Sequence, residues 1–231
     1  GWSGAGGRTQ HSVARTGALY PSHGIGPMAV WANIHRGNRF TRLTSYASKA
    51  RGLHDYVTAE GGQTHPNAGV KFRLGDVVTT SIACADGTTM RLTHDTNLPR
   101  PYSLGFRVQG EKGLWMDVNK SVHIEGQSPA HQWEPAQGWL DRYDHPLWSR
   151  FWGQAAGAGH GGMDFFAIHV FIEALKAGGD MPIDVYDAVA WSAITPLSEA
   201  SIAADNATVD FPDFTEGRWR DRQAPFDFTG A

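Results

Sequence analysis

The spacing of hydrophobic and polar side chains predicts an antiparallel sheet in the first half of the chain. Residues 39–47, 77–84 and 88–93 form runs rich in β-branched or aromatic side chains, as is typical of strands. Asp86-Gly87 separates the last two runs, and this dipeptide strongly favours the turn of a β-hairpin. We expect three more short strands at 103–109, 113–118 and 121–125.

Helical spacing appears mainly in the second half. A helix is expected from His160 until Gly178-Gly179 ends it, mostly buried, and another after Asp184, which Pro196 should kink or restart. A short helix is expected at 49–60, turns at 127–146 and an irregular lead-in at 1–17. Together these elements predict helices beside a sheet that is at least partly antiparallel, and 231 residues are enough for one large domain or two small ones.

The stretch from Leu19 to Pro27 places a phenol and an imidazole three residues apart on a turn. Pro21 should keep Tyr20 extended, Gly24 and Gly26 should bend the chain, and Pro27 suits the first turn of a helix. We therefore expect Tyr20 and His23 near a helix N-terminus, where the helix dipole favours developing negative charge. The alternative is that both side chains only pack and hydrogen-bond at a turn.

Composition excludes several classes of function. The 231 residues carry a net charge of −3, so no basic surface indicates nucleic acid, and no apolar run could span a membrane. A single cysteine, Cys84, excludes an internal disulfide and a cysteine zinc site, and the 11 histidines lack the spacing of metal ligands. Because the first residue is Gly, we expect the natural N-terminus to lie further upstream.

Residues 157–162 match G-x-G-x-x-G, the dinucleotide-binding pattern. The pattern requires a buried strand before it and a parallel strand after the helix, and neither is expected here. We therefore interpret Gly161-Gly162 as the start of a helix and not as a cofactor loop.

Several motifs resemble one family. Residues 20–27, Tyr-Pro-Ser-His-Gly-Ile-Gly-Pro, resemble the Y-P-T-H-G-x-G-P motif of glycoside hydrolase family 109, in the Gfo/Idh/MocA oxidoreductase superfamily, with Ser22 replacing Thr. Further resemblance is carried by Arg8-Thr9, His94-Asp95-Thr96 with Pro99 to Ser103, His160 to Asp164, the run from Asp184 to Ser198, and Phe211 to Thr215. It covers roughly residues 8–219.

The resemblance implies that residues 1–231 are the C-terminal, substrate-binding and dimerisation domain of a two-domain enzyme whose N-terminal domain binds NAD. For this C-terminal domain it implies an α+β fold, with an open, mostly antiparallel sheet flanked by helices. The NAD-binding domain is not recognisable in this sequence, so we expect a Rossmann domain in the same or another chain, and no activity without it. The resemblance also implies a homo-oligomer formed through the sheet, and it is consistent with a periplasmic or secreted location.

For chemistry, the resemblance implies an α-N-acetylgalactosaminidase that works by oxidation at C3, elimination, addition of water and reduction. His23 and Tyr20 are the expected catalytic pair, since imidazole changes charge near neutral pH and a phenol can donate to an oxyanion. Substrate contacts are expected from Arg8, Tyr20, Pro21, Ser22, His23 and Tyr102. Tyr20 is also expected to contact the nicotinamide, and no metal is expected. His160 is a further candidate, with a plain structural role as its alternative.

Two other functions remain open at this stage. The chain could belong to a sugar dehydrogenase of the same superfamily, or it could be a non-catalytic dimerisation domain. Net formation of NADH would indicate the dehydrogenase, and failure of an added cofactor domain to restore activity would indicate the non-catalytic domain.

Overall fold

The computed structural model describes residues 7–223, which divide into two compact units. The first unit contains residues 7–100 and 185–223 of the described chain, and the second contains residues 101–184. Each unit has its own antiparallel sheet and its own helices, so the fold is of the expected α+β class.

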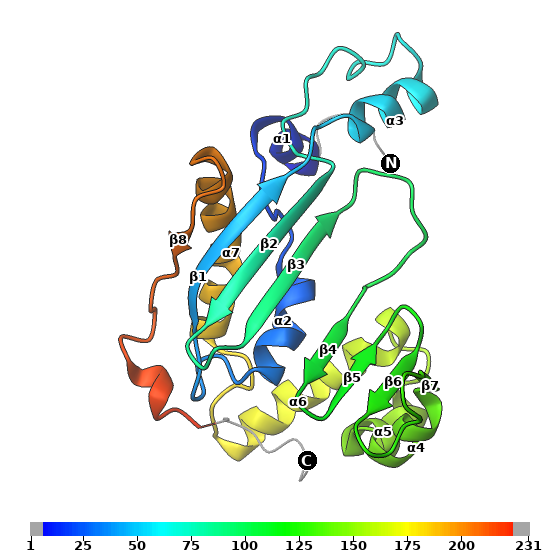
Figure 1. Cartoon of the computed structure of the whole chain (residues 1–231), viewed down its shortest axis with the longest axis vertical. Helices are drawn as coiled ribbons and strands as arrows, with labels where there is room; N and C mark the ends of the chain where they lie inside the picture. The colour runs from blue at the N-terminus through cyan, green and yellow to red at the C-terminus, as the bar shows by residue number, and fades with distance from the viewer. Residues whose placement is uncertain (1–6, 224–231) are drawn as a thin grey trace. The chain divides into compact units, whose positions relative to one another are not determined.

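The sheet of the first unit has the strand order β3-β2-β1-β8 (Figure 1). Its strands are β1 (Phe40–Ala47), β2 (Val77–Cys84), β3 (Thr89–Asp95) and β8 (Val209–Asp210), and every neighbouring pair is antiparallel. The predicted hairpin of β2 and β3 is confirmed, and Gly87 supplies the left-handed backbone of its turn with φ +92°.

Two helices cover one face of this sheet. Helix α2 (Ser22–Trp31) packs on β3 and on α7 (Val185–Ala203), and α7 packs on β1 (Figure 1). The core between these layers includes Ile25 of α2, Leu43 of β1, Ile82 of β2 and Ile194 of α7, which are at most 1% exposed. The alternation seen in the sequence arises because one strand face joins this core.

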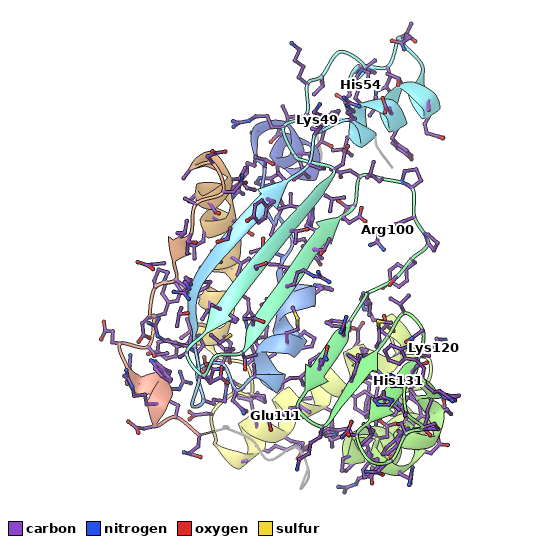
Figure 2. All side chains as sticks on the ribbon, viewed as in Figure 1. Lys49, His54, Arg100, Glu111, Lys120 and His131 are labelled. Carbon is purple, nitrogen blue, oxygen red and sulfur yellow. The ribbon has the colours of Figure 1, made fainter. Side chains whose placement is uncertain are left out.

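The remaining helices of this unit are α1 (Gly7–Ala14), α3 (Gly52–Gly61) and the 3₁₀ turn η2 (Arg218–Arg220). Helix α3 follows β1, and Figure 2 labels Lys49 just before it and His54 within it. The α3 prediction is confirmed, but the irregular lead-in is wrong, because residues 7–14 form a helix. Pro196 lies inside α7 without ending it, so of the expected kink or restart, the restart is wrong.

The second unit begins with a four-stranded sheet in the order β4-β5-β6-β7. Its strands are β4 (Arg107–Gly110), β5 (Gly113–Met116), β6 (Ser121–Ile124) and β7 (Glu134–Pro135). Lys120, labelled in Figure 2, lies in the turn between β5 and β6 and adopts φ +48°. The three strands predicted in this region are confirmed, with β4 shorter than expected.

Helices α4 (Gln137–Tyr143), α5 (Pro146–Ala155) and α6 (Met163–Ala177) complete the second unit, with the 3₁₀ turn η1 (His160–Gly162) between α5 and α6. The expectation of turns at 127–146 therefore missed α4. Aromatic rings join α5 to α6, including Trp148 stacked on Phe166 at 4.8 Å between ring centroids. Helix α6 is not mostly buried as expected, since Ile168 and Leu175 are more than half exposed.

Candidate active site

Tyr20 and His23 lie at the beginning of α2, as the sequence predicts. Pro21 is the N-cap residue with φ −77° and ψ −27°, and the helix starts at Ser22. The carbonyl of Pro21 accepts hydrogen bonds from the backbone N–H groups of Gly24 (3.1 Å) and Ile25 (2.8 Å), which closes the first turn. His23 is thus inside the first helical turn and not ahead of the helix.

The two rings contact each other on the surface of the molecule. The Tyr20 hydroxyl lies 3.3 Å from Nε2 of His23, and the ring centroids are 4.7 Å apart. Nδ1 of His23 lies 3.5 Å from Oγ of Ser22. Tyr20 is 53% exposed and His23 is also exposed, so both rings are available to a bound molecule.

The opposite side of α2 anchors this pair to the core. Ile25 and Ala29 are buried, whereas His23, Pro27 and Val30 are exposed, so the helix has one apolar and one outward face. Pro27 lies within the helix and lacks an N–H group. It therefore cannot donate to the carbonyl of His23 four residues earlier, which leaves that oxygen outside the regular helical pattern.

The two glycines of the motif act through packing and not through a bend. A Cβ on Gly24 would lie 2.5 Å from Cδ1 of Leu92 in β3, and one on Gly26 would lie 3.3 Å from the ring of Trp191 in α7. Both glycines are helical, so the predicted sharp bend is wrong. Their small size lets α2 approach the sheet and α7 closely, which fixes the height of the helix above the core.

The other expected substrate residues are placed as follows. Pro21 is buried and Ser22 exposed, both beside the Tyr20–His23 pair. The backbone of Arg8 lies in the first turn of α1, and its side chain is outside the described part of the structure. Tyr102 belongs to the second unit and is 89% exposed. The contribution of Arg8 and Tyr102 to a common sugar site stays a prediction.

The glycine-rich stretch at 157–162 connects two helices. Helix α5 precedes it and α6 follows it, so the strand that a dinucleotide loop requires is replaced by a helix. Within it, His160 adopts φ +52°, and its Nδ1 lies 2.8 Å from Oδ1 of Asp164 in the first turn of α6. His160 therefore pairs with a carboxylate at the surface. This is consistent with a role in the site and equally with a plain structural role.

The described residues contain no cluster of three His, Cys, Asp or Glu side chains that could hold a metal ion. Within the same part of the chain, no helix is both long and apolar enough to cross a membrane.

Sequence reasoning missed the polar residues that hold the segment leading to Tyr20. Thr195, Ser198 and Glu199 of α7 bind the backbone or side chains of residues 15–18. Their only signal in the sequence is that polar side chains recur at helical spacing in an otherwise apolar helix.

Sequence reasoning also assigned no role to His94, which begins the motif His94-Asp95-Thr96. It lies on β3 two residues after Leu92, on the same face of the strand, and burial lowers its pKa while the neighbouring Asp95 carboxylate offsets part of that effect.

Comparison with known proteins agrees with the motifs. Residues 1–221 match the family model described as "Glycosyl hydrolase 109, C-terminal domain". The chain is 63% identical over its whole length to a "Glycosyl hydrolase family 109 protein" of Stenotrophomonas maltophilia, of which it covers 51%. It is 56% identical over 95% of its length to an "Alpha-N-acetylgalactosaminidase" of Tannerella forsythia, of which it covers 47%.

The chain thus spans about half the length of these relatives. Among solved structures, a levoglucosan dehydrogenase in complex with NADH is similar in fold, with a TM-score of 0.62 and 19% identity over 92% of this chain and 55% of the other.

Proposed function

The chain belongs to the glycosyl hydrolase 109 family, and from that premise we propose that it forms the sugar-binding half of a glycosidase. The proposed substrate is a terminal N-acetylgalactosaminide, the class named by one close relative. The observation that carries the proposal is the exposed Tyr20–His23 pair, in hydrogen-bonding contact at the start of α2 within the family's motif. Both rings can reach a molecule from outside while the helix beneath them is anchored.

The proposed role of the pair is proton transfer at the reacting carbons of the sugar. Imidazole can accept a proton near neutral pH, so His23 suits removal of the proton at C2 once C3 is a ketone. The Tyr20 hydroxyl can donate to an oxygen that gains negative charge, and the positive end of the α2 dipole favours the same charge. The contact between the two side chains also lets a proton pass from one to the other.

The remaining proposed contacts recognise the sugar. Ser22 offers a hydroxyl beside His23, and the exposed ring of Tyr102 suits the apolar face of a pyranose. The guanidinium of Arg8 would bind hydroxyl or acyl oxygens through its several donors. Pro21 would line the site next to Tyr20.

The cofactor proposed for this reaction is NAD, held mainly by a Rossmann domain outside this sequence. When bound, NAD⁺ supplies the oxidation at C3 of the sugar and the later reduction that restores the alcohol. The described residues fit one wall of such a site, because Tyr20 is more than half exposed and could contact a nicotinamide ring. Their glycine-rich stretch lies between helices and offers no cradle for the pyrophosphate.

The test uses the full-length protein, NAD⁺ and nitrophenyl α-N-acetylgalactosaminide. We expect release of nitrophenol without net formation of NADH, since the cofactor is reduced and reoxidised in each turnover. Residues 1–231 alone should neither turn over this substrate nor bind NAD⁺ tightly in a calorimetric titration. Stoichiometric NADH would instead indicate a sugar dehydrogenase, and an inert full-length protein would contradict both enzymes.

We also propose that the protein forms homo-oligomers through the outer face of the β3-β2-β1-β8 sheet. This face, opposite α2 and α7, carries the exposed side chains of Arg42, Tyr46, Ser81 and Arg91. Light scattering after size exclusion should find a dimer, and Tyr46→Arg should shift it to monomer. A wild-type monomer at all concentrations would contradict the proposal.

A further inference from the structure

Residues 15–18, the segment that leads to Tyr20, are held by α7 through both backbone and side-chain bonds. The backbone N–H of Ala18 donates to Oγ of Ser198 (2.9 Å), and the hydroxyl of Thr195 donates to the carbonyl of Ala18 (2.7 Å). Ala18 and Ser198 are both 0% exposed. Both polar groups of one peptide segment are therefore fixed by two hydroxyls one helical turn apart.

The same face of α7 holds the residues before Ala18. The guanidinium of Arg15 makes two bonds with the carboxylate of Glu199, from Nε at 2.7 Å and from Nη2 at 2.8 Å. A Cβ on Gly17 would lie 2.6 Å from Cγ of Glu199 and 2.8 Å from Oγ of Ser198. The segment thus lies directly against the helix, and only glycine fits at position 17.

The second fixed point is the start of α2, where the Pro21 carbonyl closes the first turn and Ile25 is buried. Only Leu19 and Tyr20 lie between the clamped Ala18 and Pro21. Because the rings of Tyr20 and His23 are exposed, the backbone on either side of them has a large share in setting their direction.

We infer that Thr195 and Ser198 are positioning residues, whose hydroxyls hold the backbone at Ala18 so that Tyr20 meets His23 in the geometry that transfers protons. The expected effect on turnover rests on the proposed function. The expected effect on the position of the Tyr20 and His23 rings does not. Neither hydroxyl is proposed to touch the substrate. They act through the chain between Ala18 and Pro21.

The matched control is Ser201, one turn further along α7. Its hydroxyl accepts from the backbone N–H of Ser45 (2.9 Å) and donates to the carbonyl of Ala207 (2.7 Å), and Ser201 is also 0% exposed. Ser198 likewise accepts one backbone N–H and donates to one carbonyl, that of Thr195 at 2.7 Å. Ser198→Ala and Ser201→Ala therefore remove the same kinds of bond, but only the first releases the segment before Tyr20.

In the full-length protein, Ser198→Ala should lower kcat by about 10- to 100-fold with a smaller change in KM, because small displacements of catalytic groups reduce turnover on that scale. Ser201→Ala should lower the melting temperature similarly and leave kcat near wild type. Thr195→Val should resemble Ser198→Ala, and Thr195→Ser should retain activity because it keeps the hydroxyl. If Ser198→Ala fails to fold, Thr195→Val and Thr195→Ser provide the same comparison of variants without and with the hydroxyl.

A second measurement does not depend on activity. The ring signals of His23, observed by NMR in protein labelled at histidine and assigned with His23→Gln, should move in Ser198→Ala and Thr195→Val but not in Ser201→Ala. Equal effects of Ser198→Ala and Ser201→Ala on kcat, or unchanged His23 signals in Ser198→Ala and Thr195→Val, would overturn the inference. A wild-type protein without glycosidase activity would remove the proposed function, and the His23 signals would then decide the inference alone.

Discussion

The side chains of Tyr20 and His23 form a hydrogen-bonding contact on either side of Pro21 in the sequence. The hydroxyl oxygen of Tyr20 lies 3.3 Å from Nε2 of His23. The contact leaves the opposite ring nitrogen facing Ser22 at 3.5 Å. A substrate oxygen or proton that approaches this surface can therefore meet a phenol and an imidazole that are already coupled. That coupling predicts how variants at the two positions combine.

We expect His23→Gln to lower kcat/KM of the full-length protein by about 100-fold or more, and Tyr20→Phe by about 10-fold or more, as for acid–base residues. Because the two side chains act as a unit, the double variant should be little worse than His23→Gln alone. Steady-state kinetics of the three variants measure this, with Tyr56→Phe on α3 as a control for loss of a partly exposed phenol. Near-normal turnover of His23→Gln would end the assignment.

The ion pair between Arg36 and Asp187 predicts a large loss of stability. Nη1 and Nη2 of Arg36 donate to Oδ1 and Oδ2 of Asp187 at 3.0 and 2.8 Å, and the two side chains are 12% and 4% exposed. Asp187→Asn would remove the charge that assists both of these hydrogen bonds, so the free energy of unfolding should fall by about 1.5–3 kcal/mol. Denaturant unfolding measures the change.

The control for that prediction is the exposed pair of Glu173 and Lys176, 2.8 Å apart on α6. Glu173→Gln should have no measurable effect, because water screens an ion pair at the surface. If both variants unfolded at the same denaturant concentration as wild type, the buried pair would not contribute as argued.

Cys84 should react slowly with thiol reagents in the folded protein. It is 6% exposed, and burial, reinforced by the nearby Asp86 carboxylate, raises its pKa to about 12. Since the thiolate is the reactive form, almost none is present near neutral pH. A disulfide reagent that releases a coloured thiol should therefore titrate Cys84 fully in denaturant and only slightly without it. Rapid reaction of the native protein would contradict the burial.

The sequence predicted the strands well because their periodicity directly reflects burial on one side. β1, β2 and β3 each present buried residues on the face toward α2 and α7. Asp86-Gly87 favours the hairpin locally, because Gly87 adopts φ +92° and the carboxylate of Asp86 accepts from the backbone N–H of Thr88 (2.8 Å). The position of Tyr20 and His23 near a helix N-terminus was also predictable, although α2 already begins at Ser22 and Pro27, expected in its first turn, lies further along it. These are local properties of short segments.

The failures involve interactions between distant segments. Gly24 and Gly26 resemble flexible turn residues in sequence, whereas Leu92 and Trp191 require them to be small within a helix. The bonds between Ala18 and α7 join residues that are 177 and 180 positions apart, and no pattern near Tyr20 indicates them. Local preference cannot reveal a requirement that comes from a partner so far along the chain.

His94 predicts how stability depends on pH. Burial lowers its pKa in the folded state below the ordinary value of 6.5, and Asp95 offsets only part of this. At a pH above the pKa of His94 in the unfolded state, the imidazole is neutral in both states, and its protonation takes nothing from the free energy of unfolding. As the pH falls, the unfolded state takes up the proton first, so stability decreases until the pH is below the folded-state pKa. The melting temperature should therefore drop between about pH 7.5 and pH 5 by more in wild type than in His94→Gln.

His54→Gln provides the control, since His54 is exposed on α3 (Figure 2) and its replacement should leave the wild-type drop intact. An identical drop in wild type and His94→Gln would contradict the prediction, because it would mean that folding does not lower the pKa of His94.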